Sequence, residues 1–458
     1  MFHPLRFLFN GRRLWLSAVL FLSVFMAVQG QAETSGTTSP GIRARMVDEP
    51  VFGGSAYLLE AGKKGNPPLV LVHGLGDLAS DTWRPLIPEL AKSYHVVTFD
   101  LPGFGRSSKQ NSLYSPGNYA AFVKWVIDTY VGAPPILVGH SLGGAVALRY
   151  AGTYPDSLSR LVLIDVAGIL DRRVYTKEML SMLWAGNSVP FDVDSLLGKI
   201  VGGLSSPLLD LDVILENDLL RNQMLGGNPA VIASMALLQE NFSRYLYRVR
   251  APTAILWGEH DRVTPRRTGI LLEANLPAAR LQIIPGAGHV PMADSPRLFA
   301  TAFLAALRND VRPAGFPSGN EGRQGRCEGT GGMLFEGAYN SLEIIDCQDV
   351  QLTNVTAKSV SLVRSSAIFD KGAIIGNEIG LRAEGSTVIA NGLRIEAPVA
   401  VSASNSRLDL AGVRLSGSRA AVSTDSWVTL LFSVSRIQSP HGSGTIHGLR
   451  ELRAGEAL

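Results

Sequence analysis

The sequence predicts an α/β domain followed by an all-β domain. From residue 41 to residue 312, short apolar runs bounded by Gly, Pro or Asp alternate with longer segments of helical period. That alternation is typical of a mostly parallel sheet whose strands are buried on both faces. From residue 327 to residue 458, helical signals fade and alternating strand patterns recur about every 20 residues, which favours a short parallel β-helix. A β-sandwich is the alternative for this second region.

The composition is that of a globular and nearly neutral protein. Of the 458 residues, 46% are hydrophobic and 18% are charged, which suits two or three ordinary domains. The formal net charge is +3, and Arg6, Arg12 and Arg13 at the N-terminus carry three positive charges. Because the rest of the chain is close to neutral, we expect no nucleic-acid partner.

Residues 1–32 have the layout of a secretory signal peptide. A basic start leads into an apolar run from Leu14 to Val28, and the small residues Gly30 and Ala32 mark a cleavage point. The run is shorter than the ~20 residues that a membrane-spanning helix needs. We therefore expect a protein exported to the periplasm or secreted, with an uncleaved N-terminal membrane anchor as the alternative.

Two cysteines, Cys327 and Cys347, predict one disulfide, since an even pair in an exported protein usually forms a bond. They follow a Pro/Gly-rich segment, residues 313–326, which is typical of a linker. The two cysteines lie about one repeat apart, so stacked repeats would place their Cα atoms about 5 Å from each other. Closing this loop would stabilise the fold by roughly 3 kcal/mol and hold the first repeat in place.

A long helical segment interrupts the α/β pattern at about residues 168–250. It contains amphipathic, Met- and Leu-rich patterns and no clear strand, and it lies between the strand patterns "LVLID" and "TAILWG". An insertion at this place would form a cap over the carboxyl ends of the strands, where open α/β sheets bind ligands.

One serine lies in a motif that fits a nucleophile. Ser141 is the central residue of Gly-His-Ser-Leu-Gly, which follows the strand pattern "PILVGH" and precedes a helical pattern. This strand–turn–helix context supports a G-x-S-x-G elbow, in which glycines are required because the turn is tight and the serine backbone is strained. We therefore expect Ser141 to be a nucleophile.

A serine nucleophile needs a base, and the base needs an orienting carboxylate. His289 lies in the Gly-rich loop "PGAGHVP", and Asp261 lies on the turn "WGEHDRVTP", each just after a strand pattern. The order serine, acid, histidine is the one expected for this type of elbow. Asp165, at the end of another strand pattern, and Glu259, on the same turn as Asp261, are the alternatives for the acid.

The oxyanion of an acyl-transfer intermediate must be met by backbone N–H groups. We expect one from Leu142, directly after the serine, and one from Leu75, in the loop after the strand pattern "PLVLV". His73 in that loop is expected to brace it. Asp100 and Arg106, on the turn "DLPGFGRS", are expected to shape the site from behind.

The sequence contains no motif for a metal site, a phosphate-binding loop or a dinucleotide-binding loop. No His, Cys and Asp cluster has metal-ligand spacing, and no phosphate-binding or dinucleotide-binding glycine motif is present. We therefore expect hydrolysis without a metal or another cofactor.

Five motifs in order, "HGLGD", "DLPGFGRS", "GHSLGG", "WGEHDRVTP" and "GAGHVPMADSP", resemble those of the α/β-hydrolase superfamily. The resemblance covers about residues 45–310 and is to the capped bacterial esterase/lipase and carbon–carbon bond hydrolase branches. It implies an α/β-hydrolase fold with a helical cap, a Ser141–Asp261–His289 triad, and Leu75 and Leu142 as oxyanion donors. Dehalogenases and epoxide hydrolases of the superfamily carry an aspartate in place of Ser141, so those activities are disfavoured. The resemblance does not extend to the C-terminal region.

These observations predict an exported serine hydrolase that cleaves carboxylic esters through an acyl-enzyme on Ser141. The Met- and Leu-rich cap favours a small-molecule or lipid-like ester with an apolar acyl group. One alternative is a carbon–carbon bond hydrolase of the same fold. The other is a non-catalytic protein that contacts the cell envelope or a polysaccharide through its C-terminal domain.

Overall fold

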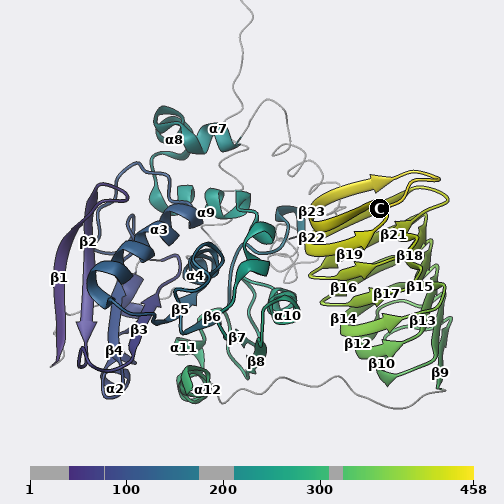
Figure 1. Cartoon of the computed structure of the whole chain (residues 1–458), viewed down its shortest axis with the longest axis horizontal. Helices are drawn as coiled ribbons and strands as arrows, with labels where there is room; N and C mark the ends of the chain where they lie inside the picture. Colours follow the sequence, from purple (N-terminus) through teal and green to yellow (C-terminus); the bar gives the residue numbers. More distant parts are fainter. Residues whose placement is uncertain (1–40, 77, 175–210, 309–322) are drawn as a thin grey trace, which may run out of the picture. The chain divides into compact units, whose positions relative to one another are not determined.

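The computed structural model describes residues 41–76, 78–174, 211–308 and 323–458 (Figure 1). The predicted signal peptide, the middle of the predicted cap and most of the predicted linker lie outside these residues. Within the described ranges, no helix combines the length and the apolar character that crossing a membrane would require.

Residues 41–308 form an eight-stranded sheet with the order β1-β2-β4-β3-β5-β6-β7-β8. Its strands are β1 (Ile42–Glu49), β2 (Gly54–Ala61), β3 (Pro68–Val72), β4 (His95–Phe99), β5 (Ile136–His140), β6 (Arg160–Ile164), β7 (Thr253–Gly258) and β8 (Arg280–Ile284). β1 and β2 pair antiparallel with each other, and β2 pairs antiparallel with β4. The pairs β3–β4, β6–β7 and β7–β8 are parallel. Strands β3 to β7 are almost wholly buried, which confirms the predicted α/β class.

Helices connect the strands. The described helices and helical turns of this region are η1 (Ala79–Trp83), α2 (Ile87–Leu90), α3 (Pro116–Val126), η2 (Ile127–Val131), α4 (Leu142–Thr153), α7 (Leu211–Glu216), α8 (Asp218–Leu225), α9 (Pro229–Gln239), η3 (Phe242–Arg244), η4 (Leu246–Arg248), α10 (Arg266–Asn275), α11 (Pro291–Asp294) and α12 (Pro296–Arg308).

The chain divides into two compact units. The first comprises Met1–Pro135, Gly139–Val146 and Arg172–Glu240, and the second comprises Ile136–Val138, Ala147–Asp171 and Asn241–Leu458. The second unit therefore contains both the β6–β8 part of the first sheet and the C-terminal strands.

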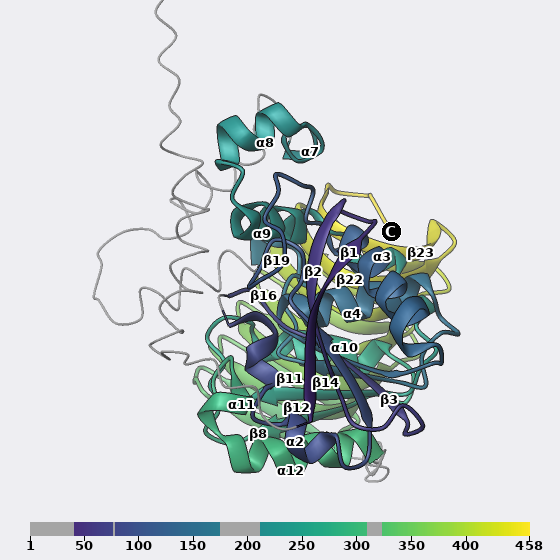
Figure 2. The ribbon, with the colours of Figure 1, turned by 90° about the vertical axis from the view of Figure 1, so that its left-hand side faces the viewer.

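In the first unit, helices α7, α8 and α9 belong to the predicted insertion between β6 and β7, and they pack on one another (Figure 2). Asn217 and Asn228 cap α8 and α9, because each side chain accepts hydrogen bonds from the first N–H groups of its helix. Arg221 of α8 is buried and donates to the side chain and the backbone carbonyl of Asn111. This arginine ties the helices to the loop that precedes α3.

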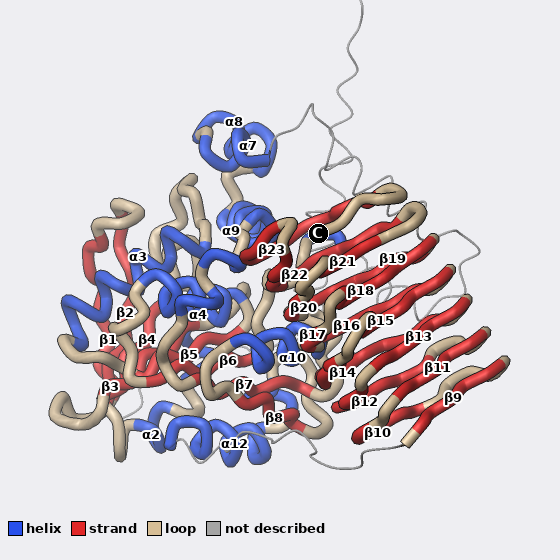
Figure 3. The backbone as a smooth tube through the Cα atoms, turned by 45° about the vertical axis from the view of Figure 1, so that its right-hand side comes forward, coloured by secondary structure: helices blue, strands red, loops and turns tan. Residues whose placement is uncertain are grey.

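Residues 323–458 form a domain of parallel sheets, as the repeat predicts. One sheet has the order β21-β18-β15-β13-β11-β9, and the other has the order β10-β12-β14-β16-β19-β22-β20-β17, with β23 paired to β22 (Figure 3). The strands are β9 (Gln324–Glu328), β10 (Leu334–Ala338), β11 (Ser341–Ile345), β12 (Val350–Ala357), β13 (Ser359–Val363), β14 (Ser366–Ile375), β15 (Ile379–Glu384), β16 (Thr387–Asn391), β17 (Arg394–Glu396), β18 (Val399–Ser404), β19 (Ser406–Ala411), β20 (Arg414–Ser416), β21 (Ala420–Ser423), β22 (Val428–Ser439) and β23 (Gly442–Leu452). All their pairings are parallel except β22–β23, an arrangement consistent with a β-helix-like domain and unlike an antiparallel β-sandwich.

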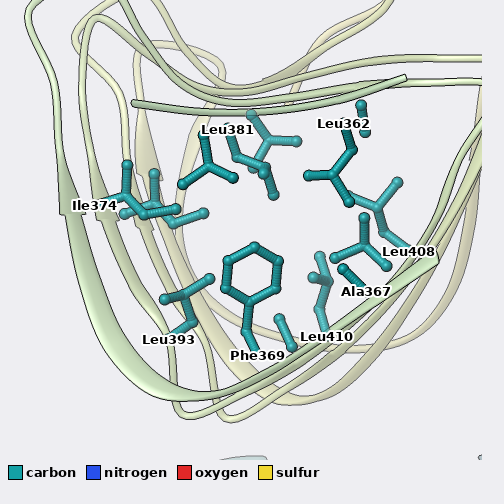
Figure 4. Packing of buried hydrophobic residues seen from close by; sticks show 14 of the residues in the cluster. Leu362, Ala367, Phe369, Ile374, Leu381, Leu393, Leu408 and Leu410 are labelled. Carbon is teal, nitrogen blue, oxygen red and sulfur yellow. The ribbon is translucent and has the colours of Figure 1, made fainter. Parts of the chain in front are cut away.

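The register of this domain reproduces the predicted repeat. Val360 pairs with Leu381, Leu381 pairs with Val401, and Val401 pairs with Val422. In strands such as β12, β13 and β14, alternate residues are buried. They contribute to one apolar core, in which Phe369 and Ile374 lie among leucines of the neighbouring strands (Figure 4). Each fully buried Leu, Ile or Phe side chain contributes about 1.5–3 kcal/mol to folding. The stacked repeats therefore stabilise one another.

The predicted disulfide joins Cys327 to Cys347, with a Cα–Cα distance of 6.4 Å. The expected register was wrong, because the strand partner of Cys327 is Ile344 and not Cys347. The first repeat is shorter than the later ones, so a spacing of 20 residues places Cys347 beyond the end of β11. The bond therefore links β9 to the turn after β11, and its Cα atoms lie farther apart than the expected 5 Å.

Within the second unit, α10 packs against turns of the C-terminal domain. Arg267 forms a two-pronged ion pair with Asp409, at 2.8 and 2.9 Å, and also donates to Asn391 at 2.9 Å. Gly412 has a φ of +64°, and a Cβ placed on it would lie only 2.7 Å from Nδ2 of Asn275 on the same helix. The turn at Gly412 therefore packs so closely against α10 that no side chain fits between them.

A second contact forms at an irregular position of β22. The pairing of β22 with β23 shifts register between Phe432 and Ser435, and Val434 has a left-handed φ of 41°. At this position Asp171 donates its backbone N–H to Ser433 Oγ (2.9 Å), and the Tyr247 hydroxyl donates to the Val434 carbonyl (3.2 Å). The segment after β6 is thus hydrogen-bonded directly to the C-terminal strands.

Candidate active site

Ser141 lies on a strained turn between β5 and α4. Its φ of +54° is in the left-handed region, which a non-glycine residue adopts only when its surroundings enforce it. A Cβ on Gly139 would lie 2.1 Å from the carbonyl oxygen of Gly143, and a Cβ on Gly143 would lie 2.4 Å from that of His73. No side chain fits at either position. The close packing that forces the elbow is therefore the reason for the two glycines of the motif.

The loop after β3 lies directly beside Ser141. A Cβ on Gly74 would approach the Ser141 Cβ to 2.9 Å, so the backbone of this loop touches the serine side chain. Leu75 follows in the same loop and is buried, and Leu142 is the first residue of α4. The first N–H groups of a helix have no partner within the helix and can serve an anion. Both predicted oxyanion donors therefore belong to segments adjacent to the serine.

His73 braces this loop in its neutral form. Its Nε2 accepts the backbone N–H of Leu101 at 2.8 Å, so the ring proton is on Nδ1, which donates to the Gly74 carbonyl at 2.6 Å. Burial lowers the pKa of His73 below its usual value, and the nearby Asp100 only partly opposes that effect. With both nitrogens engaged by the backbone, His73 holds the loop in position.

Asp100 forms a hydrogen-bonded network with Arg106 and Ser80. Its carboxylate accepts hydrogen bonds from the Arg106 backbone N–H at 2.8 Å and from the Arg106 Nε at 2.9 Å. It also accepts the Ser80 backbone N–H at 2.9 Å. Burial opposes ionisation of Asp100, but the hydrogen bonds from Arg106 and Ser80 outweigh it and lower its pKa. This network is the one expected to shape the site from behind, although nothing in the sequence pointed to Ser80.

In the second unit, Asp261 and His289 form a buried pair. Nδ1 of His289 lies 2.9 Å from Oδ2 of Asp261, and both side chains are almost fully buried. Because a carboxylate only accepts, Nδ1 is the protonated nitrogen, and in the neutral ring Nε2 is then the basic one. The loops that follow β7 and β8 bring the two predicted residues into direct contact.

Three further hydrogen bonds hold the Asp261 carboxylate. Its Oδ1 accepts the N–H groups of Val263 (2.7 Å) and Thr264 (2.9 Å), and the Thr264 hydroxyl donates to Oδ2. Burial disfavours the charge, but protonated His289 and the Thr264 bonds outweigh it and lower the pKa of Asp261 to about 2. Thr264 was missed at the level of sequence, although Asp-x-x-Thr is a recognisable local turn pattern.

The two alternative acids each accept a backbone N–H group. Glu259 is half-exposed and accepts the backbone N–H of Gly286 at 2.9 Å, so it braces the loop that leads to His289. Asp165 is fully buried at the end of β6, and its Oδ1 accepts the Gly258 N–H at 2.8 Å. His289 donates instead to the carboxylate of Asp261.

Each unit by itself carries part of the predicted machinery. The first unit holds a serine on an elbow beside backbone N–H groups, and the second holds a histidine oriented by a carboxylate. The part of the chain that the structure describes contains no group of three His, Cys, Asp or Glu side chains that could hold a metal ion.

Comparison with known proteins shows what this chain is similar to. The model of the alpha/beta hydrolase family matches residues 69–302. The chain is 30% identical over 256 residues to an uncharacterised protein of Mycobacterium tuberculosis, covering 51% of this chain and 73% of that protein. It is 29% identical over 257 residues to the 2-hydroxy-6-oxononadienedioate/2-hydroxy-6-oxononatrienedioate hydrolase of Comamonas testosteroni (51% of this chain, 84% of that enzyme). It is 29% identical over 251 residues to the pimeloyl-(acyl-carrier protein) methyl ester esterase of Edwardsiella ictaluri (53% and 92%).

Proposed function

The chain belongs to the alpha/beta hydrolase family, and from this premise we propose that it is an exported serine hydrolase that cleaves carboxylic esters. The observation that carries the proposal is the buried hydrogen bond from His289 Nδ1 to Asp261, which gives the histidine the tautomer that a general base requires. The strained backbone of Ser141 supports its role as the nucleophile.

In the proposed reaction, Ser141 Oγ attacks the acyl carbon while His289 Nε2 takes the hydroxyl proton. The backbone N–H groups of Leu75 and Leu142 stabilise the oxyanion. His289 then returns the proton to the leaving alcohol, and Asp261 stabilises the imidazolium that forms meanwhile. Water removes the acyl group by the same steps in reverse.

The substrate and the location are part of the proposal. The esterase of Edwardsiella ictaluri supports an ester substrate. The Met- and Leu-rich pattern of the predicted cap, with the mostly buried apolar helix α9, favours a small-molecule or lipid-like acyl group. The Cys327–Cys347 disulfide favours an oxidising compartment, in line with a signal peptide in residues 1–32. We propose the domain division 41–312 with a cap at about 168–250, a linker at 313–326, and 327–458. A polysaccharide partner for the C-terminal domain finds no support in these relatives.

A carbon–carbon bond hydrolase is the second candidate, because the Comamonas testosteroni relative is named for that reaction. An export signal favours the ester over this alternative, since the corresponding ring-cleavage products are cytosolic.

A kinetic comparison separates the two candidates. We expect the purified full-length protein to hydrolyse p-nitrophenyl esters, with kcat/KM rising from the acetate to a medium acyl chain. It should turn over a vinylogous 1,5-diketone at least 100-fold more slowly. The reverse preference would favour the carbon–carbon bond hydrolase, and no ester turnover at any chain length would contradict the proposal.

A further inference from the structure

Asp165, which the sequence offered as an alternative to Asp261, is a fully buried carboxyl group to which the proposed reaction gives no role. It follows β6 directly, is fully buried, and has a left-handed φ of 44°. Its backbone N–H donates to the Leu256 carbonyl at 3.1 Å, and its Oδ1 accepts the Gly258 N–H at 2.8 Å. The end of β6 is therefore locked to β7, with the carboxyl group directed toward the turn that carries Asp261.

The second carboxyl oxygen of Asp165 has an unusual environment. Among the described residues, none donates a hydrogen bond to Oδ2, although the atom is buried. Thr264 links the two acids, because its hydroxyl donates to Asp261 Oδ2 and also lies 3.3 Å from the Asp165 carbonyl oxygen. Two ionised carboxylates cannot hydrogen-bond to each other, and a buried unpaired charge is costly. One proton shared between the two groups removes both penalties.

We propose that Asp165 is a positioning residue that remains protonated in the folded protein and donates its carboxyl proton to Asp261. The positioning role rests on the proposed function of Asp261 and His289, whereas the protonation of Asp165 does not. The bond would add one more donor to the Asp261 carboxylate, which already accepts from Val263, Thr264 and His289. It would prevent the carboxylate from turning away from His289.

The charges around the pair place the proton on Asp165. Burial, and then the charge of Asp261, raise the pKa of Asp165 well above its usual value, and the more distant Asp294 acts in the same direction. Asp261 has the cation-forming His289 and the Thr264 hydroxyl as partners, so its own pKa is low. The carboxyl group with several hydrogen-bond donors keeps the negative charge, and the group without them keeps the proton.

Protonation can be tested by the pH dependence of stability, independently of catalysis. An unfolded aspartate loses its proton above pH ~4, whereas folded Asp165 retains it, so this residue makes the fold less stable as pH rises. Asp165→Asn removes that dependence. We expect the Tm of Asp165→Asn minus that of the full-length wild type to grow by roughly 1–3 °C per pH unit between pH 5 and pH 8. The exposed Asp156→Asn should give a constant difference.

A constant or shrinking difference for Asp165→Asn would overturn the proposal. If that variant does not fold, infrared spectroscopy of the wild type decides the same question. We expect the carbonyl band of a protonated carboxylic acid to persist at pH 8, and its absence would contradict a protonated Asp165.

The positioning role is tested with Asp165→Asn and Asp165→Ala on the ester substrate. The amide can accept from Gly258 and donate to Asp261, so Asp165→Asn should keep kcat within about twofold, whereas Asp165→Ala should lose about tenfold. Equal kcat values in the two variants would overturn the role.

The pH profile of kcat/KM in Asp165→Asn adds a second readout. Its acid limb should not move, because no charge is removed. A shift of the limb to lower pH by about one unit would show an ionised Asp165 and contradict the proposal. Absence of any ester turnover in the wild type would count against the proposed function alone, since the Tm comparison still decides the protonation of Asp165.

Discussion

At the scale of single residues, the site depends on the charge of one carboxylate and on the strain of one backbone. Asp261 is ionised although it is buried, because His289 and Thr264 compensate for the lost solvation. Ser141 keeps a left-handed φ on a tightly packed turn, and this packing is possible because Gly139 and Gly143 have no side chains. Both features can be tested without knowing the natural substrate.

Replacing Asp261 by asparagine should abolish most of the activity. The amide occupies the same space, but its NH2 group cannot stabilise an imidazolium and favours the wrong tautomer of His289. We expect kcat for a p-nitrophenyl ester to fall by about 10⁴-fold. Glu259→Gln, on the same turn, is the control and should lose less than about threefold. A comparable loss in the two variants would mean that Asp261 only maintains the fold of the turn.

Asp261 should also make the protein sensitive to acid. Its pKa is about 2 in the folded protein and about 4 in the unfolded chain, so its ionised form stabilises the fold above pH ~4. This stabilisation, about 2–3 kcal/mol, is lost as the pH falls through 2. In urea titrations, the free energy of unfolding of Asp261→Asn should approach that of the wild type between pH 5 and pH 2. A difference that does not change with pH would contradict the ionised, buried carboxylate.

At the scale of elements, α10 is the helix on which the C-terminal strands are packed. The Arg267–Asp409 pair is mostly buried, so losing either partner would leave a charge without compensation. The turns at Gly392 and Gly412 lie against the same helix, and both glycines have positive φ angles. The requirement for glycine there combines backbone conformation with close packing.

A pair of glycine variants separates those two causes. Gly412→Ala puts a Cβ against Asn275 and Leu271, whereas Gly385→Ala, in a turn of similar φ, finds its nearest neighbour at 3.7 Å. We expect Gly385→Ala to cost about 1 kcal/mol of unfolding free energy, and Gly412→Ala to cost at least 1–3 kcal/mol more. Chemical denaturation of both full-length variants measures this. Equal costs would show that α10 does not press on the turn at Gly412.

At the scale of the whole molecule, the second compact unit unites β6–β8 with all of the C-terminal strands. Its contacts include the ion pair on α10 and the hydrogen bonds of Asp171 and Tyr247 to the irregular part of β22. These contacts connect the C-terminal domain to the same unit that holds Asp261 and His289. We therefore expect the two regions to stay associated even without a covalent connection.

Cutting the chain between residues 308 and 323 tests that expectation. A protease site inserted there in the full-length protein should yield two fragments that co-elute in gel filtration and retain the ester hydrolysis of the uncut protein. Addition of Arg267→Ala should weaken the association. Separation of the fragments, with an active and soluble N-terminal part, would instead mean that the C-terminal domain is an independent module.

Local patterns in the sequence predicted the sheet, the repeat and the motifs around Ser141, Asp261 and His289, because each depends on residues close together in the chain. The contact of α10 could not be predicted in this way. Arg267 and Asp409 are 142 residues apart, and neither lies in a motif. The prediction that Cys347 lies one repeat after Cys327 was wrong for a related reason. The first repeat is shorter than the average on which that prediction relied. The hydrogen bond from the Gly258 N–H to Asp165 likewise depends on the ends of β6 and β7 lying side by side.

The most direct test of Ser141 as the nucleophile is its reaction with a fluorophosphonate probe in the folded full-length protein. We expect stoichiometric labelling, located by mass spectrometry on the peptide that contains Ser141. Ser141→Ala should take no label, and the reaction should slow strongly in His289→Asn. A folded wild type that stays unlabelled, or that carries the label on another residue, would contradict a serine hydrolase acting through Ser141.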